Sequence, residues 1–169
     1  MGNILGKTSA RALLFVFLGS GFGCALLGSG EDPVKKNPGI KFQPPPNPFA
    51  QSHISSADQV WQSESTGNTI AINSTCQEYS DLTLKDLQQN ILGGIENLKV
   101  QSDKTVSFDG REAQRIVSVG SAEGVSISVD LLILKKNNCT YDLAYIARSK
   151  FYDDEHGIFE TFLKRFHAP

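Results

Sequence analysis

The stretch that decides the fold is VSISVDLLILKKNNCTYDLAYIA, residues 125–147. Its odd positions from 125 to 133 are all apolar: Val125, Ile127, Val129, Leu131 and Ile133. This two-residue period predicts a strand with one face turned to a core. Leu132 and Leu134 lie on the other face, so we expect burial on both sides near the end of the strand. Asn137-Asn138 supplies a turn, and the stretch therefore predicts a long hairpin.

Shorter strand-like runs lie N-terminal to this hairpin. The two nearest are VQSDKTVSF (100–108) and EAQRIVSVGS (112–121), which an Asp-Gly turn joins. Further back are VWQSES (60–65) and NTIAINST (68–75), whose spacing suits a hairpin of its own. Because the connections are short turns, these runs predict a mainly antiparallel sheet.

A helical pattern occupies DLTLKDLQQNILGGIENL, residues 81–98. Thr83 is a good N-cap, and Asp86 has the spacing of a capping box. An apolar stripe at helical spacing follows: Leu84, Leu87, Ile91, Ile95 and Leu98. Gly93 and Gly94 each cost about 1 kcal/mol relative to alanine inside a helix. They mark either a close approach to the sheet or a weakened last turn.

A second helical pattern closes the chain. Its apolar residues have the spacing of a core-facing stripe: Phe159, Phe162, Leu163 and Phe166. The element order is therefore β-β-α-β-β-β-β-α. This order predicts an α+β sandwich, in which two helices flank a mainly antiparallel sheet of about six strands.

Three stretches carry a resemblance to the PsbP-like fold. SFDGREAQRIVSVG (107–120) is similar to its middle turn and strand, the segment 129–147 to its long hairpin, and IFETFLKRF (158–166) to its C-terminal helix. Extrinsic photosystem proteins, a Ran-binding nuclear transport factor and many bacterial envelope lipoproteins share this fold. Together with DLTLKDL (81–87), the pattern most resembles small proteobacterial envelope lipoproteins, over roughly residues 58–166. The resemblance implies accessory or scaffolding roles in larger assemblies.

Residues 1–23 have the layout of a secretory signal. Lys7 and Arg11 form a charged start, and the apolar stretch ALLFVFLGSGFG follows. This stretch is short for a membrane span, which needs about 20 apolar residues. The glycines of residues 18–30 do not match a dinucleotide-binding loop, because a Pro-containing segment follows where such a loop requires a helix.

Cys24 follows this signal and is the candidate lipid acceptor. The sequence before it resembles the bacterial lipoprotein signal, in which Leu, a small residue and Gly or Ala precede the cysteine. Gly23 fits that pattern, whereas Phe22 is large and Gly21 stands where Leu is expected. The resemblance implies a lipid on the sulfur of Cys24. Cleavage after Gly30 and an uncleaved anchor are the alternatives.

Residues 25–52 contain every proline except Pro169. QPPPNP favours extended polyproline II, which predicts a spacer that holds a domain away from a membrane. A Pro-rich docking site for a partner is the alternative. We therefore expect a signal peptide at 1–23, a lipid anchor and linker at 24–52, and a globular domain at 53–169.

The remaining cysteines are Cys76 and Cys139. Two cysteines of one domain in an oxidising envelope most often pair. We therefore predict a disulfide that closes a loop of about 60 residues. Two buried free thiols, or a redox or metal site, are the alternatives. The chain has no C-x-x-C motif, which argues against thioredoxin-like chemistry.

No catalytic set can be read from the sequence. The histidines are His53, His156 and His167. Three acids precede His156: Asp153, Asp154 and Glu155. Adjacent helical side chains point in different directions, so we interpret this run as helix-start acids that complement the dipole, with a hard-cation site as the alternative. Asp109, Arg111 and Glu112 are interpreted as a turn with an ion pair rather than a carboxylate pair.

The formal net charge of −2, with no basic block, argues against nucleic acid as a partner. We expect an envelope lipoprotein that is held in the membrane by its lipid and works as a non-enzymatic accessory or scaffold module. It would bind a protein partner and need no cofactor or metal. Ala25-Leu26 lacks an acidic retention signal, which favours the outer membrane, facing the periplasm. The alternative function is carriage of a small apolar ligand or lipid.

Overall fold

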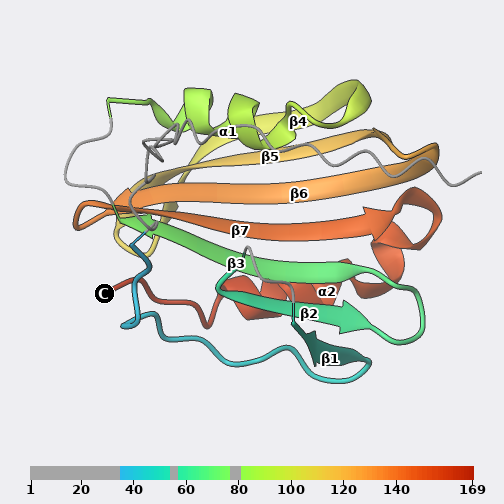
Figure 1. The fold of residues 1–169 in the computed structure, drawn as a ribbon, viewed down its shortest axis with the longest axis horizontal. Coiled ribbons are helices and arrows are strands. Elements are labelled where there is room, and N and C mark those ends of the chain that lie inside the picture. Colours follow the sequence, from blue (N-terminus) through green and yellow to red (C-terminus); the bar gives the residue numbers. More distant parts are fainter. Residues whose placement is uncertain (1–34, 54–56, 77–80) are drawn as a thin grey trace, which may run out of the picture. The chain divides into compact units, whose positions relative to one another are not determined.

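A computed structural model describes residues 35–53, 57–76 and 81–169 (Figure 1). Within these residues the chain forms seven strands, two α-helices and one short 3-10 helix. In chain order they are β1 (Phe49–Ser52), β2 (Gln59–Ser63), β3 (Thr69–Cys76), α1 (Leu84–Leu92), β4 (Glu96–Phe108), β5 (Arg111–Ala122), β6 (Val125–Lys136), β7 (Cys139–Arg148), η1 (Ser149–Phe151) and α2 (Tyr152–Leu163).

The strands form one sheet in the order β1-β2-β3-β7-β6-β5-β4. Each pair of neighbours is antiparallel. The hairpin predicted at 125–147 is formed by β6 and β7 near the centre of the sheet, and Asn137 and Asn138 in its turn have the positive φ that such turns require. The α+β prediction is confirmed. The sheet has one strand more than the six expected, because β1 precedes the first strand-like run of the sequence.

Both faces of β6 are buried towards its end, as Leu132 and Leu134 predicted. Leu132 and Leu134 pack in the cluster that α2 covers, whereas Leu131 and Ile133 pack in the cluster on the α1 side. The stripe of the C-terminal helix is confirmed for Phe159, Phe162 and Leu163, which are buried on α2. Phe166 is buried as well, but it lies beyond the end of the helix at Leu163. The central hairpin is therefore the layer on which both helices pack.

Helix α1 is shorter than its apolar stripe suggested. The capping box between Thr83 and Asp86 is present, but the helix ends at Leu92, with Gly93 as its C-cap. Leu98 belongs to β4, so the extension of the stripe to Leu98 was wrong. The apolar spacing continues past the glycines only by coincidence, because the chain there is already turning into an extended strand.

The close approach of helix-side backbone to the sheet lies at Gly120 of β5, not at the helical glycines. A Cβ at Gly120 would collide with Cγ2 of Ile95 and would lie 2.8 Å from the carbonyl oxygen of Glu96. The segment that links α1 to β4 therefore crosses directly over this glycine. Only a residue without a side chain leaves room for that crossing.

From Lys35 onward the Pro-rich segment is part of the domain, which corrects the spacer predicted up to residue 52 and the boundary at 53. Phe49 is buried, and β1 pairs with β2. Phe42 packs edge-on against Trp61, with ring centroids 5.4 Å apart. An extended proline stretch does not form a core by itself, but the aromatic residues that flank it do pack. The predicted signal, Cys24 and the rest of residues 1–34 lie outside the described residues.

Candidate functional site

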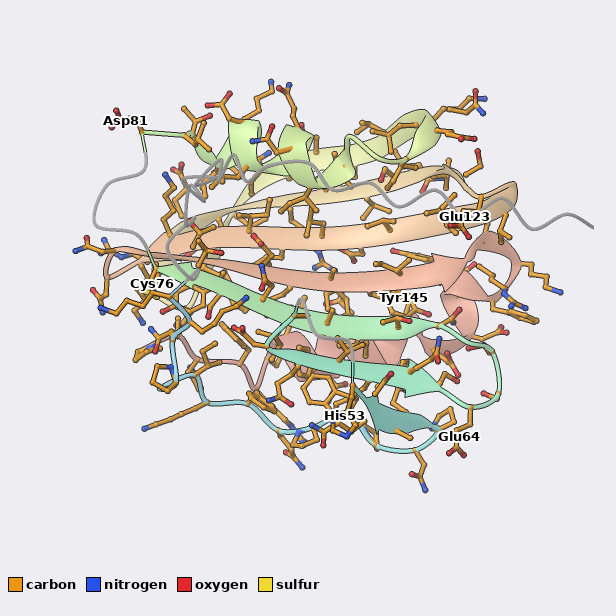
Figure 2. All side chains as sticks on the ribbon, viewed as in Figure 1. His53, Glu64, Cys76, Asp81, Glu123 and Tyr145 are labelled. Carbon is orange, nitrogen blue, oxygen red and sulfur yellow. A yellow bond between two sulfur atoms is a disulfide. The ribbon has the colours of Figure 1, made fainter. Side chains whose placement is uncertain are left out.

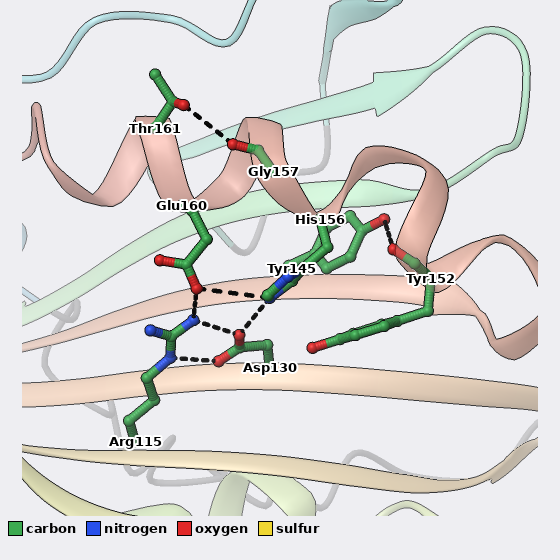
Figure 3. A network of polar contacts seen from close by, with 8 residues as sticks. All are labelled: Arg115, Asp130, Tyr145, Tyr152, His156, Gly157, Glu160 and Thr161. Carbon is green, nitrogen blue, oxygen red and sulfur yellow. Dashed lines mark hydrogen bonds and ion pairs between the residues drawn. The ribbon is translucent and has the colours of Figure 1, made fainter.

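A network of charged side chains connects α2 with the sheet (Figure 3). Its centre is Asp130 of β6, which is fully buried. Arg115 of β5 donates to Asp130 through Nε (2.9 Å to Oδ1) and Nη2 (2.6 Å to Oδ2), and also donates to Glu160 of α2. Nε2 of His156 lies 2.8 Å from Oδ2 of Asp130 and 3.7 Å from Oε1 of Glu160.

Asp130, His156 and Glu160 offer three metal-ligand atoms within 4.8 Å of one another. Arg115, however, already bonds both carboxylates and brings the positive charge that a cation would supply. Hydrogen bonding to Asp130 raises the pKa of the Arg115 guanidinium, so this charge is permanent. The arrangement therefore fits an ion-pair network that fastens α2 to the sheet better than it fits a metal centre.

Glu155, the neighbour of His156, points to a different set of partners. Its carboxylate accepts hydrogen bonds from Ser63 (2.6 Å), Thr66 (2.7 Å) and Asn68 (2.8 Å) around the β2–β3 turn. Burial alone would raise the pKa of Glu155, but these hydrogen bonds lower it below its ordinary value. The divergence of adjacent side chains on α2 agrees with the interpretation that this acidic run does not form one metal site.

Asp109 anchors the C-terminal tail. Its carboxylate pairs with Lys136 (3.0 Å), accepts from the backbone N–H of Ala168 (2.9 Å) and lies 3.0 Å from Nδ1 of His167. The ion pair of this turn is therefore made with Lys136 of the next hairpin rather than with Arg111, its neighbour in sequence. The turn has a structural role, as expected, with a partner that the sequence did not indicate.

Cys76 and Cys139 form a disulfide, which confirms that prediction. They are directly opposed residues at the adjoining ends of β3 and β7. The bond therefore closes one end of the sheet, on the same side as the Asn137-Asn138 turn (Figure 2).

A cavity of about 670 Å³ opens beside this end of the sheet, on the face that α1 covers. Its apolar wall consists of Leu82, Leu87 and Ile91. Thr75 of β3 and Asp142 of β7 are among its polar lining. Leu82 and Ile91 are 45% and 43% exposed, so the cavity wall presents apolar surface to solvent.

Asp142 is the least satisfied charged residue of this cavity. Its Oδ1 is buried and has no hydrogen-bond partner among the described residues, and Oδ2 accepts a long bond of 3.4 Å from Asn73. Burial raises the pKa of Asp142 to about 6, while the nearby Lys36 opposes this and Asp58 adds to it. A buried, under-bonded carboxyl in a cavity is a candidate ligand contact.

Sequence reasoning missed Asp130 and Asp142 as site residues. Each is an acid inside an apolar strand, Asp130 in VDLLIL and Asp142 in TYDLAYIA. A charge at such a position requires a partner or a function, and this was the available signal.

Comparison with known proteins shows the fold. No family model and no curated protein matches the chain. The solved structure of the cyanobacterial PsbP protein CyanoP, from Synechocystis sp. PCC 6803, aligns with a TM-score of 0.55 at 15% identity and covers 90% of this chain and 99% of that chain. LpqN of Mycobacterium tuberculosis, described as involved in cell envelope biogenesis, aligns with a TM-score of 0.57 at 13% identity over 83% and 88% of the two chains. The domain therefore has a PsbP-like fold, as the sequence resemblance implied.

Among the residues that the structure describes, no helix is both long and apolar enough to cross a membrane.

Proposed function

We propose that this protein is a bacterial envelope lipoprotein whose PsbP-like domain is a non-enzymatic accessory module that binds a protein partner. A lipid on Cys24 would hold it in the outer membrane, facing the periplasm. The secretory layout of residues 1–23 and the cysteine that follows support the anchor. The description of LpqN, a protein of the same fold, as involved in cell envelope biogenesis is consistent with this setting.

The observation that carries the binding role is the cavity beside α1. It combines exposed apolar side chains, Leu82 and Ile91, with the under-bonded carboxyl of Asp142. Apolar anchors beside a few polar groups are what a partner's side chain requires for specific docking. The domain is thus equipped to accept a group of a partner protein at this place.

A non-enzymatic role is supported by the way the other polar clusters are used. Asp130 is engaged by Arg115 and His156, and Glu155 by the β2–β3 turn. These carboxylates hold elements of the fold together. Their oxygen atoms are already engaged in hydrogen bonds and ion pairs, so they are not available to transfer protons or to bind a ligand. The apolar side chains on both faces of β6, which motivated the alternative of an apolar-ligand carrier, are packed in the two hydrophobic clusters.

Photo-crosslinking in intact cells tests the binding site. A photoreactive phenylalanine analogue at Ile91, on the cavity wall, is expected to give a discrete adduct with one envelope protein. The same analogue at Val125, which is also exposed but lies at the opposite end of the sheet, is the matched control. Only monomer at Ile91, or the same adducts at both positions, would reject the proposed partner site.

Fatty-acid labelling tests the anchor separately. Wild-type chain is expected to incorporate radioactive palmitate, and Cys24→Ser is expected to lose the label. An unchanged label in the variant would reject Cys24 as the lipid acceptor.

A further inference from the structure

The N-terminal segment joins the folded domain at the disulfide end of the sheet. The backbone N–H of Cys76 donates to the carbonyl of Lys35 over 2.8 Å. The backbone N–H of Asn37 donates to Oγ of Ser74 (2.9 Å), and its side-chain amide donates to Oη of Tyr141 (2.6 Å). From Lys35 onward the chain is therefore fixed to β3 and β7, next to the disulfide.

This attachment shortens the tether that a lipid on Cys24 would provide. Only ten residues lie between Cys24 and Lys35, in place of the spacer to residue 52 that the proline content predicted. Eleven peptide units span at most about 40 Å when fully extended, at 3.3–3.6 Å per residue. Lys35 is thus held within this distance of the membrane, whatever the conformation of the tether.

The sheet itself is about as long as the tether. β5 has twelve residues, which span about 40 Å at 3.3–3.4 Å per residue. Turning the opposite end of the sheet to the membrane would carry the attachment point to the far side of the domain and require a nearly straight tether. Full extension removes most of the chain's conformations and is disfavoured. When the disulfide end faces the membrane instead, the tether between Cys24 and Lys35 does not need to be extended.

Charge favours the same orientation. Exposed cations near the disulfide end include Lys35, Lys36, Lys41, Lys85 and Arg111, and the exposed acids there include Asp81, Asp86 and Glu112. Near the opposite end the exposed acids include Glu64, Glu96, Glu123, Asp153 and Asp154, and the exposed cations include Lys99, Arg148 and Lys150. Anionic headgroups attract Lys and Arg by about 1 kcal/mol each near the surface and repel acids. The more acidic end is therefore directed away from the membrane.

We propose that the disulfide end of the sheet is the lipid-facing surface of this protein, next to phospholipid headgroups. The proposal rests on the lipid anchor at Cys24. It also places the cavity on the membrane-proximal side, because Leu82 and the turn residues Asn137 and Asn138 at the disulfide end are part of its lining. A partner that reaches the cavity would then itself lie at or in the membrane.

Lipid-dependent quenching tests the orientation. Full-length lipidated protein carries one new thiol, Arg111→Cys at the disulfide end or Val125→Cys at the opposite end, because the lipid and the disulfide occupy the native cysteines. Both positions begin neighbouring antiparallel strands, are exposed and are labelled with the same fluorophore. The proteins are placed in nanodiscs of phosphatidylethanolamine and phosphatidylglycerol that contain a lipid with a nitroxide headgroup.

We expect the label at position 111 to be quenched several-fold more than the label at position 125. Equal quenching, or stronger quenching at 125, overturns the orientation while leaving the anchor intact. Failure of the anchor is recognised independently, since such a chain takes up no fatty acid and does not stay with the nanodiscs. Equal melting temperatures of the two unlabelled variants and the wild type would establish that neither substitution perturbs the fold.

Discussion

Cys76 and Cys139 face each other across β3 and β7, with their Cα atoms 4.0 Å apart, and Cys76 also bonds the carbonyl of Lys35. One residue thus connects the incoming segment, β3 and the central hairpin. The disulfide therefore lies at the point where the proposed tether joins the sheet.

Removal of this bond should lower stability. In the chain-entropy model a cross-link over 63 residues contributes about 4 kcal/mol, and measured values are commonly about 2–4 kcal/mol. We expect Cys76→Ala/Cys139→Ala to lose this amount of unfolding free energy in urea titrations. The control is wild type in reductant, which should approach the double variant. If the oxidised and reduced wild type unfold at the same urea concentration, the bond has no stabilising role.

Asp142 should make stability decrease with rising pH. Its pKa in the fold, about 6, lies above its ordinary value of 3.8, so the folded state holds a proton that the unfolded state has released. The resulting stabilisation is complete below about pH 4 and is lost as pH rises through about 6. Asp142→Asn removes this dependence. At pH 7.5 this substitution should raise the free energy of unfolding by at most about 3 kcal/mol, and the melting temperature with it. At pH 4 it should have little effect.

A pH scan of unfolding for both proteins checks this prediction. Lys36, Asp58 and Asn73 are the groups that face Asp142, and they are unchanged in the variant. Parallel stability curves for wild type and variant between pH 4 and 7 would contradict it. A stabilising variant that loses its partner adduct at Ile91 would identify Asp142 as a residue kept for binding at a cost in stability.

Gly120 should not tolerate a side chain. A Cβ there meets Ile95 and the backbone of Glu96, so Gly120→Ala must displace the α1–β4 connection. Overpacking of this kind costs about 1–3 kcal/mol. Gly94→Ala is the matched control, because a Cβ at that position meets nothing within 4 Å. Thermal unfolding should separate the two variants, and equal melting temperatures would show that the crossing adjusts freely.

The parts of the fold that the sequence predicted are those in which local period and packing agree. The hairpin at 125–147 has an apolar residue at every odd position up to Ile133, and its two strands pair with each other across a short turn. The stripe from Phe159 to Phe166 likewise needs only one covering surface. Helix α1 was overextended because Leu98 keeps the helical spacing although the chain has already become β4. The apolar period indicates which face of a helix is buried, but it does not indicate the residue at which the helix ends.

The contacts that define the candidate site depend on register, which the sequence does not display. Arg115 and Asp130 are fifteen residues apart and meet because β5 and β6 pair in one register. The cavity needs α1 to lie beside β7, and the attachment of Lys35 needs a segment whose composition is typical of a linker. For this reason the sequence shows that Asp130 and Asp142 are charges inside apolar strands, but it does not show which residues contact them.

The ion-pair network beneath α2 should be strongly coupled. Arg115→Met leaves the buried carboxylate of Asp130 with only His156 as its partner. Loss of one partner of a buried ion pair costs about 3–5 kcal/mol of stability. Because the Arg115 side chain is partly exposed, we expect a loss near the lower end of this range. Replacing both charges, in Arg115→Met/Asp130→Leu, removes the unpaired charge and should restore part of this stability. Urea unfolding of the single and double variants gives the coupling energy. If the double variant loses the sum of the two single losses, Arg115 and Asp130 act independently, and the predicted coupling is absent.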